Sequence, residues 1–93
     1  MKKGQKLPTT TTVEDMFEAS IGDKYFGTVV LYNVYIEDIH TMYVVEYDSL
    51  MRTGGGIEYK HFGYDENEAR KFFDSEVAEI KKDIVKALSK EVA

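Results

Sequence analysis

The C-terminal part of this chain holds the pattern that most restricts its fold, an apolar stripe with helical spacing. In the stretch DENEARKFFDSEVAEIKKDIVKALSK, residues 65–90, apolar side chains recur every three or four positions, as they do in an amphipathic helix. Asp65 and Glu68 form a capping box at its start. The stripe consists of Ala69, Phe73, Val77, Ile80, Ile84 and Leu88. A long helix with one apolar face needs a second layer to pack against.

Runs rich in β-branched and aromatic residues supply that layer. They are YFGTVVLYNVYI (25–36), TMYVVEY (41–47) and IEYKHF (57–62), and this composition predicts strands. Short polar or glycine-rich links between them favour an antiparallel meander. Glycines 54–56 lead into a strand rather than into a helix N-terminus, so we interpret them as a hairpin turn and not as a phosphate-binding loop.

The N-terminal part predicts a tail followed by a short helix. Residues 1–11 have no apolar periodicity and are expected to be a flexible tail. Thr12 and Asp15 resemble a capping box, and Gly22 is a natural helix terminator. The apolar positions between them, at helical spacing, are Val13, Met16, Phe17 and Ile21. The prediction is therefore a single α+β domain over 12–93, in the order α-β-β-β-α, with a three-stranded antiparallel meander and the C-terminal helix packed on one face.

The sequence leaves open what covers the second face of this sheet. The run 25–36 is apolar on both sides, because Val29 and Leu31 point one way while Val30, Tyr32 and its alternating neighbours point the other. Such a strand needs cover on both faces. Either the N-terminal helix covers the second face, or aromatic surface is left there for a partner. Tyrosine suits a partner surface because it buries area and keeps a polar tip.

Length and composition narrow the class of protein. Ninety-three residues suffice for one small domain. No cysteine occurs, so disulfides, thiolate metal sites and cysteine nucleophiles are excluded, and a reducing compartment is expected. No apolar run is long enough to span a bilayer, and the basic start MKKGQKLPTTTT has no apolar core of a secretory signal. We expect a cytoplasmic protein.

The charge distribution points to a basic protein partner. Residues 13–80 carry fifteen acidic and five basic residues, a net charge of −10. Such a surface repels nucleic acid and attracts basic proteins. We therefore expect no direct nucleic-acid binding and no membrane binding. The predicted partner-binding residues are the acids Glu14, Asp15, Glu18, Glu37, Asp38, Glu46, Asp48, Glu66 and Glu68, together with Tyr25, Tyr35 and Arg52.

No catalytic constellation can be assembled from the sequence. The serines lack a nucleophile-elbow motif, and the two histidines, His40 and His61, match no metal-ligand spacing. A hairpin turning on the glycines would place Asp48 opposite His61. The sequence thus predicts no enzyme, cofactor or metal. The alternative function is a structural homo-oligomer that pairs through the uncovered sheet face or the edge of the strand 25–36. The third is a ligand-binding or enzymatic role near His40 and the glycine turn at residues 54–56.

The order of elements over residues 12–90 resembles the double-stranded RNA-binding domain. That family presents lysines at the start of its last helix, whereas this chain has Asp65, Glu66, Asn67 and Glu68 there, which would repel RNA. In size, lack of cysteine, acidity and layout the chain also resembles small phage-encoded inhibitors of bacterial defence nucleases, of the anti-CRISPR type. That resemblance implies a nucleic-acid mimic that occupies the basic groove of a nuclease.

Overall fold

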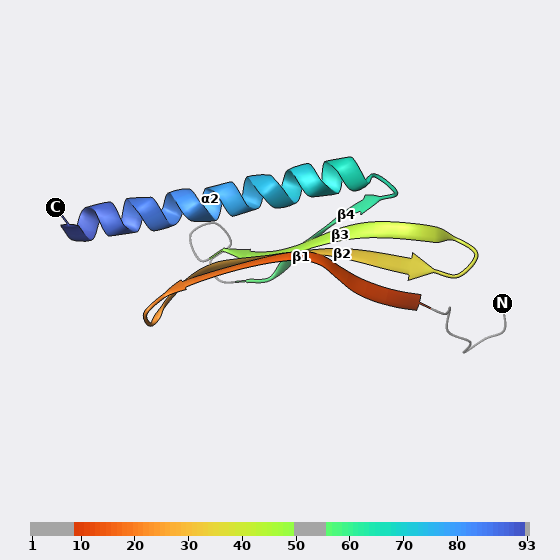
Figure 1. Cartoon of the computed structure of the whole chain (residues 1–93), viewed down its shortest axis with the longest axis horizontal. Coiled ribbons are helices and arrows are strands. Elements are labelled where there is room, and N and C mark those ends of the chain that lie inside the picture. Colours follow the sequence, from red (N-terminus) through yellow and green to blue (C-terminus); the bar gives the residue numbers. More distant parts are fainter. Residues whose placement is uncertain (1–8, 50–55, 93) are drawn as a thin grey trace.

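The computed structural model describes residues 9–49 and 56–92, and they form an antiparallel sheet with a long helix on it (Figure 1). The strands follow one another across the sheet in chain order: β1 (Thr9–Ile21), β2 (Lys24–Ile36), β3 (His40–Ser49) and β4 (Glu58–Gly63). The helix α2 (Glu66–Val92) follows β4. The α+β class, the antiparallel meander and the C-terminal helix packed on one face are confirmed, but the sheet has four strands where three were predicted.

The predicted N-terminal helix is wrong, because residues 12–21 belong to β1. A β-bulge explains the error. The register passes from Val13 opposite Tyr32 to Asp15 opposite Leu31, and Met16 then lies opposite Val30. Glu14 is therefore the extra residue of a bulge, and it places Val13 and Met16 on the same face three positions apart. Apolar residues three positions apart are also typical of one face of a helix. Residues 9–11, assigned to the tail, also pair with β2 in this strand.

Two hairpin turns fix the order of β1, β2 and β3. Gly22 was predicted to end a helix, but it forms the turn between β1 and β2 with a φ of 60°, a conformation that glycine adopts without a Cβ clash. Asp38, in the β2–β3 turn, has a φ of 64°, which Asn and Asp tolerate better than other non-glycine residues. The hairpin turn predicted at glycines 54–56 lies mostly outside the described residues.

The core lies between α2 and one face of the sheet. Val29, Leu31 and Val45 from the strands and Ala69 and Ile80 from the helix are all at most 2% exposed. The apolar stripe predicted for α2 is correct over most of its length. It differs in detail, since Leu88 is 39% exposed and Glu76, which was not assigned to the stripe, is 4% exposed.

Gly27 lets the two layers approach each other. A Cβ built on Gly27 would lie 2.7 Å from the backbone oxygen of Asp48 and 2.8 Å from Cδ1 of Ile80. These distances are shorter than van der Waals contact, so no larger residue fits there unless its surroundings move. Because Ile80 lies over Gly27, this position also identifies the side of β2 that faces the helix.

Candidate partner-binding face

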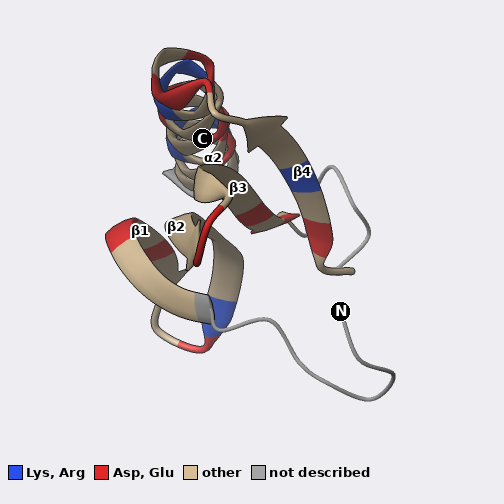
Figure 2. Cartoon of the chain, turned by 90° about the vertical axis from the view of Figure 1, so that its right-hand side faces the viewer, with Lys and Arg blue, Asp and Glu red and all other residues tan. Residues whose placement is uncertain are grey.

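The two faces of the sheet differ in what covers them. Gly27 lies against Ile80, and the Tyr47 ring contacts the Phe72 ring at 5.2 Å between centroids, so these strand residues point toward α2. Their neighbours along each strand point away from it. Among the described elements, none covers that second side of the sheet, as Figure 2 shows with α2 on one side only.

We call this second side the open face. The register and the alternation of side chains assign to it Thr11, Val13, Met16, Glu18 and Ser20 of β1, Tyr25, Thr28, Val30, Tyr32, Val34 and Ile36 of β2, His40, Met42, Val44, Glu46 and Asp48 of β3, and Tyr59 and His61 of β4. No lysine or arginine belongs to this set of described strand residues. No N-terminal helix covers this face. Val13, Met16 and Tyr59 are 53%, 54% and 57% exposed there, whereas Val30, at its centre, is only 5% exposed because its neighbours surround it.

One end of the open face combines acids with tyrosine hydroxyls. Glu18, Thr28 and Asp48 form one row across β1, β2 and β3. The Tyr25 hydroxyl lies 2.6 Å from Oγ1 of Thr28 and donates a hydrogen bond to Oδ2 of Asp48 at 3.1 Å. Burial raises the pKa of Tyr25; the Thr28 hydrogen bond lowers it, and the bond to Asp48 raises it further. The neutral hydroxyl is therefore held as a donor toward this carboxylate.

A second acid–tyrosine pair, Tyr32 and Glu46, lies further along β2 and β3 on the same face. The Tyr32 hydroxyl donates to Oε1 of Glu46 at 3.3 Å. Burial, followed by the negative charge of Glu46, raises the pKa of Tyr32, so this hydroxyl also stays protonated near neutral pH. Tyr32 was not among the predicted partner-binding residues, although its position on the second side of the run 25–36 was visible in the alternation of the sequence.

Three cations of the described residues lie on the other side of the sheet. Lys60 Nζ lies 4.8 Å from the centroid of Phe72, Arg70 Cζ lies 5.6 Å from that of Phe73, and Lys81 Nζ lies 5.7 Å from that of Phe17. These are cation–π distances at the seam between α2 and the sheet. These three side chains are thereby held away from the acids of the open face.

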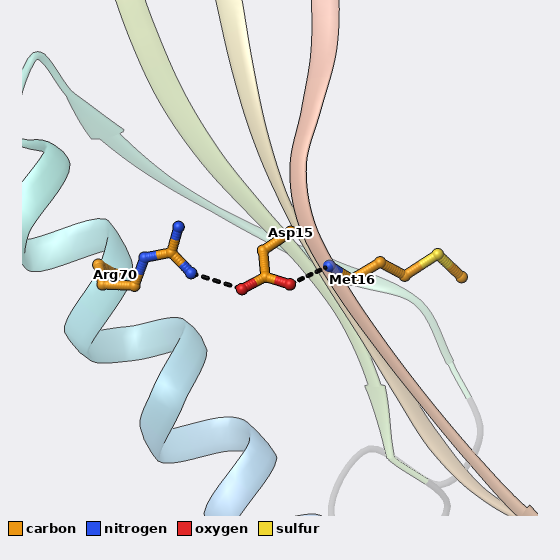
Figure 3. A network of polar contacts seen from close by, with 3 residues as sticks. All are labelled: Asp15, Met16 and Arg70. Carbon is orange, nitrogen blue, oxygen red and sulfur yellow. Dashed lines mark hydrogen bonds and ion pairs between the residues drawn. The ribbon is translucent and has the colours of Figure 1, made fainter.

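Asp15 has a structural role. Its Oδ2 accepts a hydrogen bond from Nη1 of Arg70 at 2.7 Å, and its Oδ1 accepts one from the backbone N–H of Met16 at 2.8 Å (Figure 3). Asp15 lies opposite Leu31 and so points to the helix side. The structure thus places this predicted partner-binding residue away from the open face and neutralises its charge.

The other predicted residues are spread over the molecule. Of the acids, only Glu18, Glu46 and Asp48 share the open face. Tyr25 joins them because Phe26 is the extra residue of a second bulge, opposite Ala19 and Ser20. Tyr35, opposite Thr10, lies on the other side of β2, the side of Leu31. The remaining acids lie at the β1 bulge (Glu14), in the β2–β3 turn (Glu37 and Asp38) and in the first turn of α2 (Glu66 and Glu68). Arg52 lies outside the described residues.

The expected pairing of Asp48 with His61 is wrong. His61 lies opposite Val44, and Asp48 lies opposite Thr28. His40 packs edge-on against Tyr64, with 5.5 Å between ring centroids. Within the part of the chain that the structure describes, no group of three or more potential ligands could hold a metal ion, and no helix has the length and apolarity to cross a membrane.

Comparisons with known proteins identify no relative of this chain. No family model, no curated protein and no solved structure matches the chain.

Proposed function

We propose that this protein is a non-enzymatic binding module that docks its open face on a basic partner protein. One observation carries the proposal: a whole sheet face bears acids, tyrosines and apolar side chains, with no lysine or arginine among its described strand residues, and the described elements leave it uncovered. Val13, Met16 and Tyr59 on this face are 53%, 54% and 57% exposed, and exposed apolar side chains bordered by polar groups are typical of a protein–protein interaction site.

The chemistry of the face fits a basic partner better than a neutral one. The acids of the face would steer a positively charged protein toward it and align it. The tyrosine hydroxyls hold Glu46 and Asp48 in fixed positions, so these carboxylates lose little freedom on binding. A nuclease or another nucleic-acid-binding protein presents such a basic surface, and the proposed role is then that of an inhibitor or adaptor, as in phage inhibitors of the anti-CRISPR type.

The test compares baits that carry the same change in net charge. One variant, Glu18→Lys with Glu46→Lys, changes the open face; the control, Asp74→Lys with Glu79→Lys, changes the helix. Each bait is incubated with a bacterial lysate at low salt, and retained proteins are quantified after elution with rising salt. We expect basic proteins to be retained by the wild-type and control baits and lost from the open-face variant. Equal retention by all three baits would contradict the proposal.

A second candidate function is a homodimer formed through the sheet. The predicted edge was wrong, since β2 lies between β1 and β3. The edge strands of the described sheet are β1 and β4. The longer one is β1, with thirteen residues, and such an edge can pair with another chain. Light scattering at micromolar concentration tests this candidate: a dimer mass supports it, and a monomer mass excludes it while leaving the first proposal intact.

A further inference from the structure

A hollow lies on the open face, at the end opposite the Glu18–Asp48 row. Its volume is about 220 Å³, and it is bordered by Val34, Ile36, Met42, Tyr43, Val44, His61 and Gly63. The Tyr43 side chain packs against the core, so on the open face the walls are aliphatic and thioether groups, with one imidazole beside them.

A bulge in β4 produces this hollow. The register passes from Val44 opposite His61 to Tyr43 opposite Gly63, so Phe62 is the extra residue. The Phe62 ring lies 5.5 Å from that of Phe72, on the helix side. Gly63 has no side chain, and no atom lies within 4 Å of the position that its Cβ would take. Beyond His61, β4 thus places no side chain over the open face.

The size of the hollow restricts what it can bind. Pockets for small-molecule ligands are roughly 300 to 1,000 Å³, larger than this hollow of about 220 Å³. A hollow of this size suits one large side chain, and an apolar anchor in a pocket is the usual centre of a protein interface. Two acids lie on the same face along β3: Glu46 and Asp48 are two and four residues from Val44, about 7 and about 14 Å away. Glu18 lies in the same row as Asp48 but on β1, with Thr28 of β2 between them.

We propose that the hollow receives one large apolar side chain of an extended, basic segment of the partner, whose basic side chains meet Glu46 and then the Glu18–Asp48 row. In an extended chain, side chains two and four positions apart point the same way and are spaced by about 7 Å. The recognised pattern is therefore an apolar residue with arginine or lysine two and four positions away. This inference rests on the proposed function, since it specifies which segment of a basic partner the open face selects.

Defined peptides test the inference with the full-length protein. The probe is a synthetic peptide with one phenylalanine and arginines two and four positions later; the comparison peptide has alanine in place of phenylalanine. Binding is followed by NMR through the methyl signals of Val34, Met42 and Val44. We expect the phenylalanine peptide to bind about tenfold more tightly or better, from burial of its ring, with shifts at these three methyl-bearing residues.

Matched variants separate the anchor from the charges. Val34→Phe should fill the hollow and abolish the preference for phenylalanine while salt-dependent binding persists. Val85→Phe, on the 64% exposed position of α2, adds the same ring elsewhere and should leave the preference unchanged. Glu46→Gln should weaken both peptides by a similar factor. A preference that survives Val34→Phe would overturn the inference.

The remaining outcomes distinguish the inference from the proposed function. Two results would overturn the apolar anchor: equal, salt-dependent binding of both peptides, or no binding of either. They overturn the anchor alone if the Glu18→Lys and Glu46→Lys variant still loses its partners from lysate. If that variant retains them, both proposals fail. Tight binding of N-acetylphenylalanine amide by itself would indicate a small-molecule site, and self-association abolished by Val34→Phe would indicate a second copy of the chain. Either result would overturn the proposed occupant.

Discussion

Replacing Gly27 with alanine should destabilise the protein, because α2 and β3 leave no room for a methyl group. The new Cβ would lie 2.7 Å from the backbone oxygen of Asp48 and 2.8 Å from Cδ1 of Ile80. Overpacking of this kind costs about 1–3 kcal/mol, and the lower entropy of alanine in the unfolded chain offsets about 0.4–1 kcal/mol of that cost. We expect a net loss of about 1–2 kcal/mol in the free energy of unfolding, measured by urea denaturation.

A double-mutant cycle with Ile80 tests the cause of that loss. Ile80→Ala alone should cost about 2–5 kcal/mol, because a side chain that is only 2% exposed leaves a cavity. In that background, the methyl group of Gly27→Ala enters the vacated space and only the contact with the Asp48 oxygen remains. The double variant should therefore be more stable than the sum of the single effects predicts, by about 0.5 kcal/mol or more. Val85→Ala, at an exposed position of the same helix, is the control and should couple with Gly27→Ala by less than about 0.5 kcal/mol. Additive effects of Gly27 and Ile80 would refute the packing of α2 on the sheet described above.

Three further predictions concern single interactions. Asp65→Ala removes the carboxylate that accepts the Glu68 N–H at 3.0 Å and should cost about 1 kcal/mol in urea unfolding, whereas Asp65→Asn should restore most of it; equal losses would argue against the cap. The side chains of Asp15 and Arg70 are 47% and 42% exposed, respectively. A double-mutant cycle with alanine should therefore give a coupling energy of only about 0.2–1 kcal/mol that shrinks at high salt. A coupling energy unaffected by salt would contradict a solvent-exposed pair. Burial is the largest cause that raises the pKa of Tyr25, Tyr32 and Tyr43 in the folded protein. The stability that these groups contribute is therefore complete below the unfolded-state pKa of about 10 and is lost as the pH rises through the folded-state values. Tyr32→Phe should flatten this alkaline decline in the free energy of unfolding, and an unchanged slope would count against the prediction.

The sequence contained enough local information to predict α2 and the strands β2, β3 and β4. A cap at Asp65 and an apolar period kept over many turns can only belong to a helix, and β-branched runs between short links define a meander. It did not contain such information for β1. The bulge at Glu14 places Val13 and Met16 three positions apart on one face, and this spacing is also that of a helix. The competing β signal, four consecutive threonines, is divided between the predicted tail, which ends at residue 11, and the predicted helix, which begins at Thr12.

The acids of the site were recognisable by type but not by position. Which carboxylates share a face depends on strand register, and register depends on bulges that the sequence does not mark. The bulge at Phe26 brings Tyr25 beside Asp48, a residue 23 positions away in the chain. Asp15 is removed from the acidic surface by Arg70, which lies 55 positions further along. Long-range pairings of this kind require the assembled sheet and helix.

The central claim is that the open face, with its acids, is the surface through which the protein recognises a partner. It is tested most directly by measuring the affinity for a captured partner at several salt concentrations, with the wild type, the Glu18→Lys and Glu46→Lys variant, and the charge-matched helix variant. We expect the affinity to fall steeply with salt for the wild type and the helix variant, and the open-face variant to bind weakly at every salt concentration. An affinity that does not change with salt, or that the open-face variant retains, would rule out recognition through the acids of the open face.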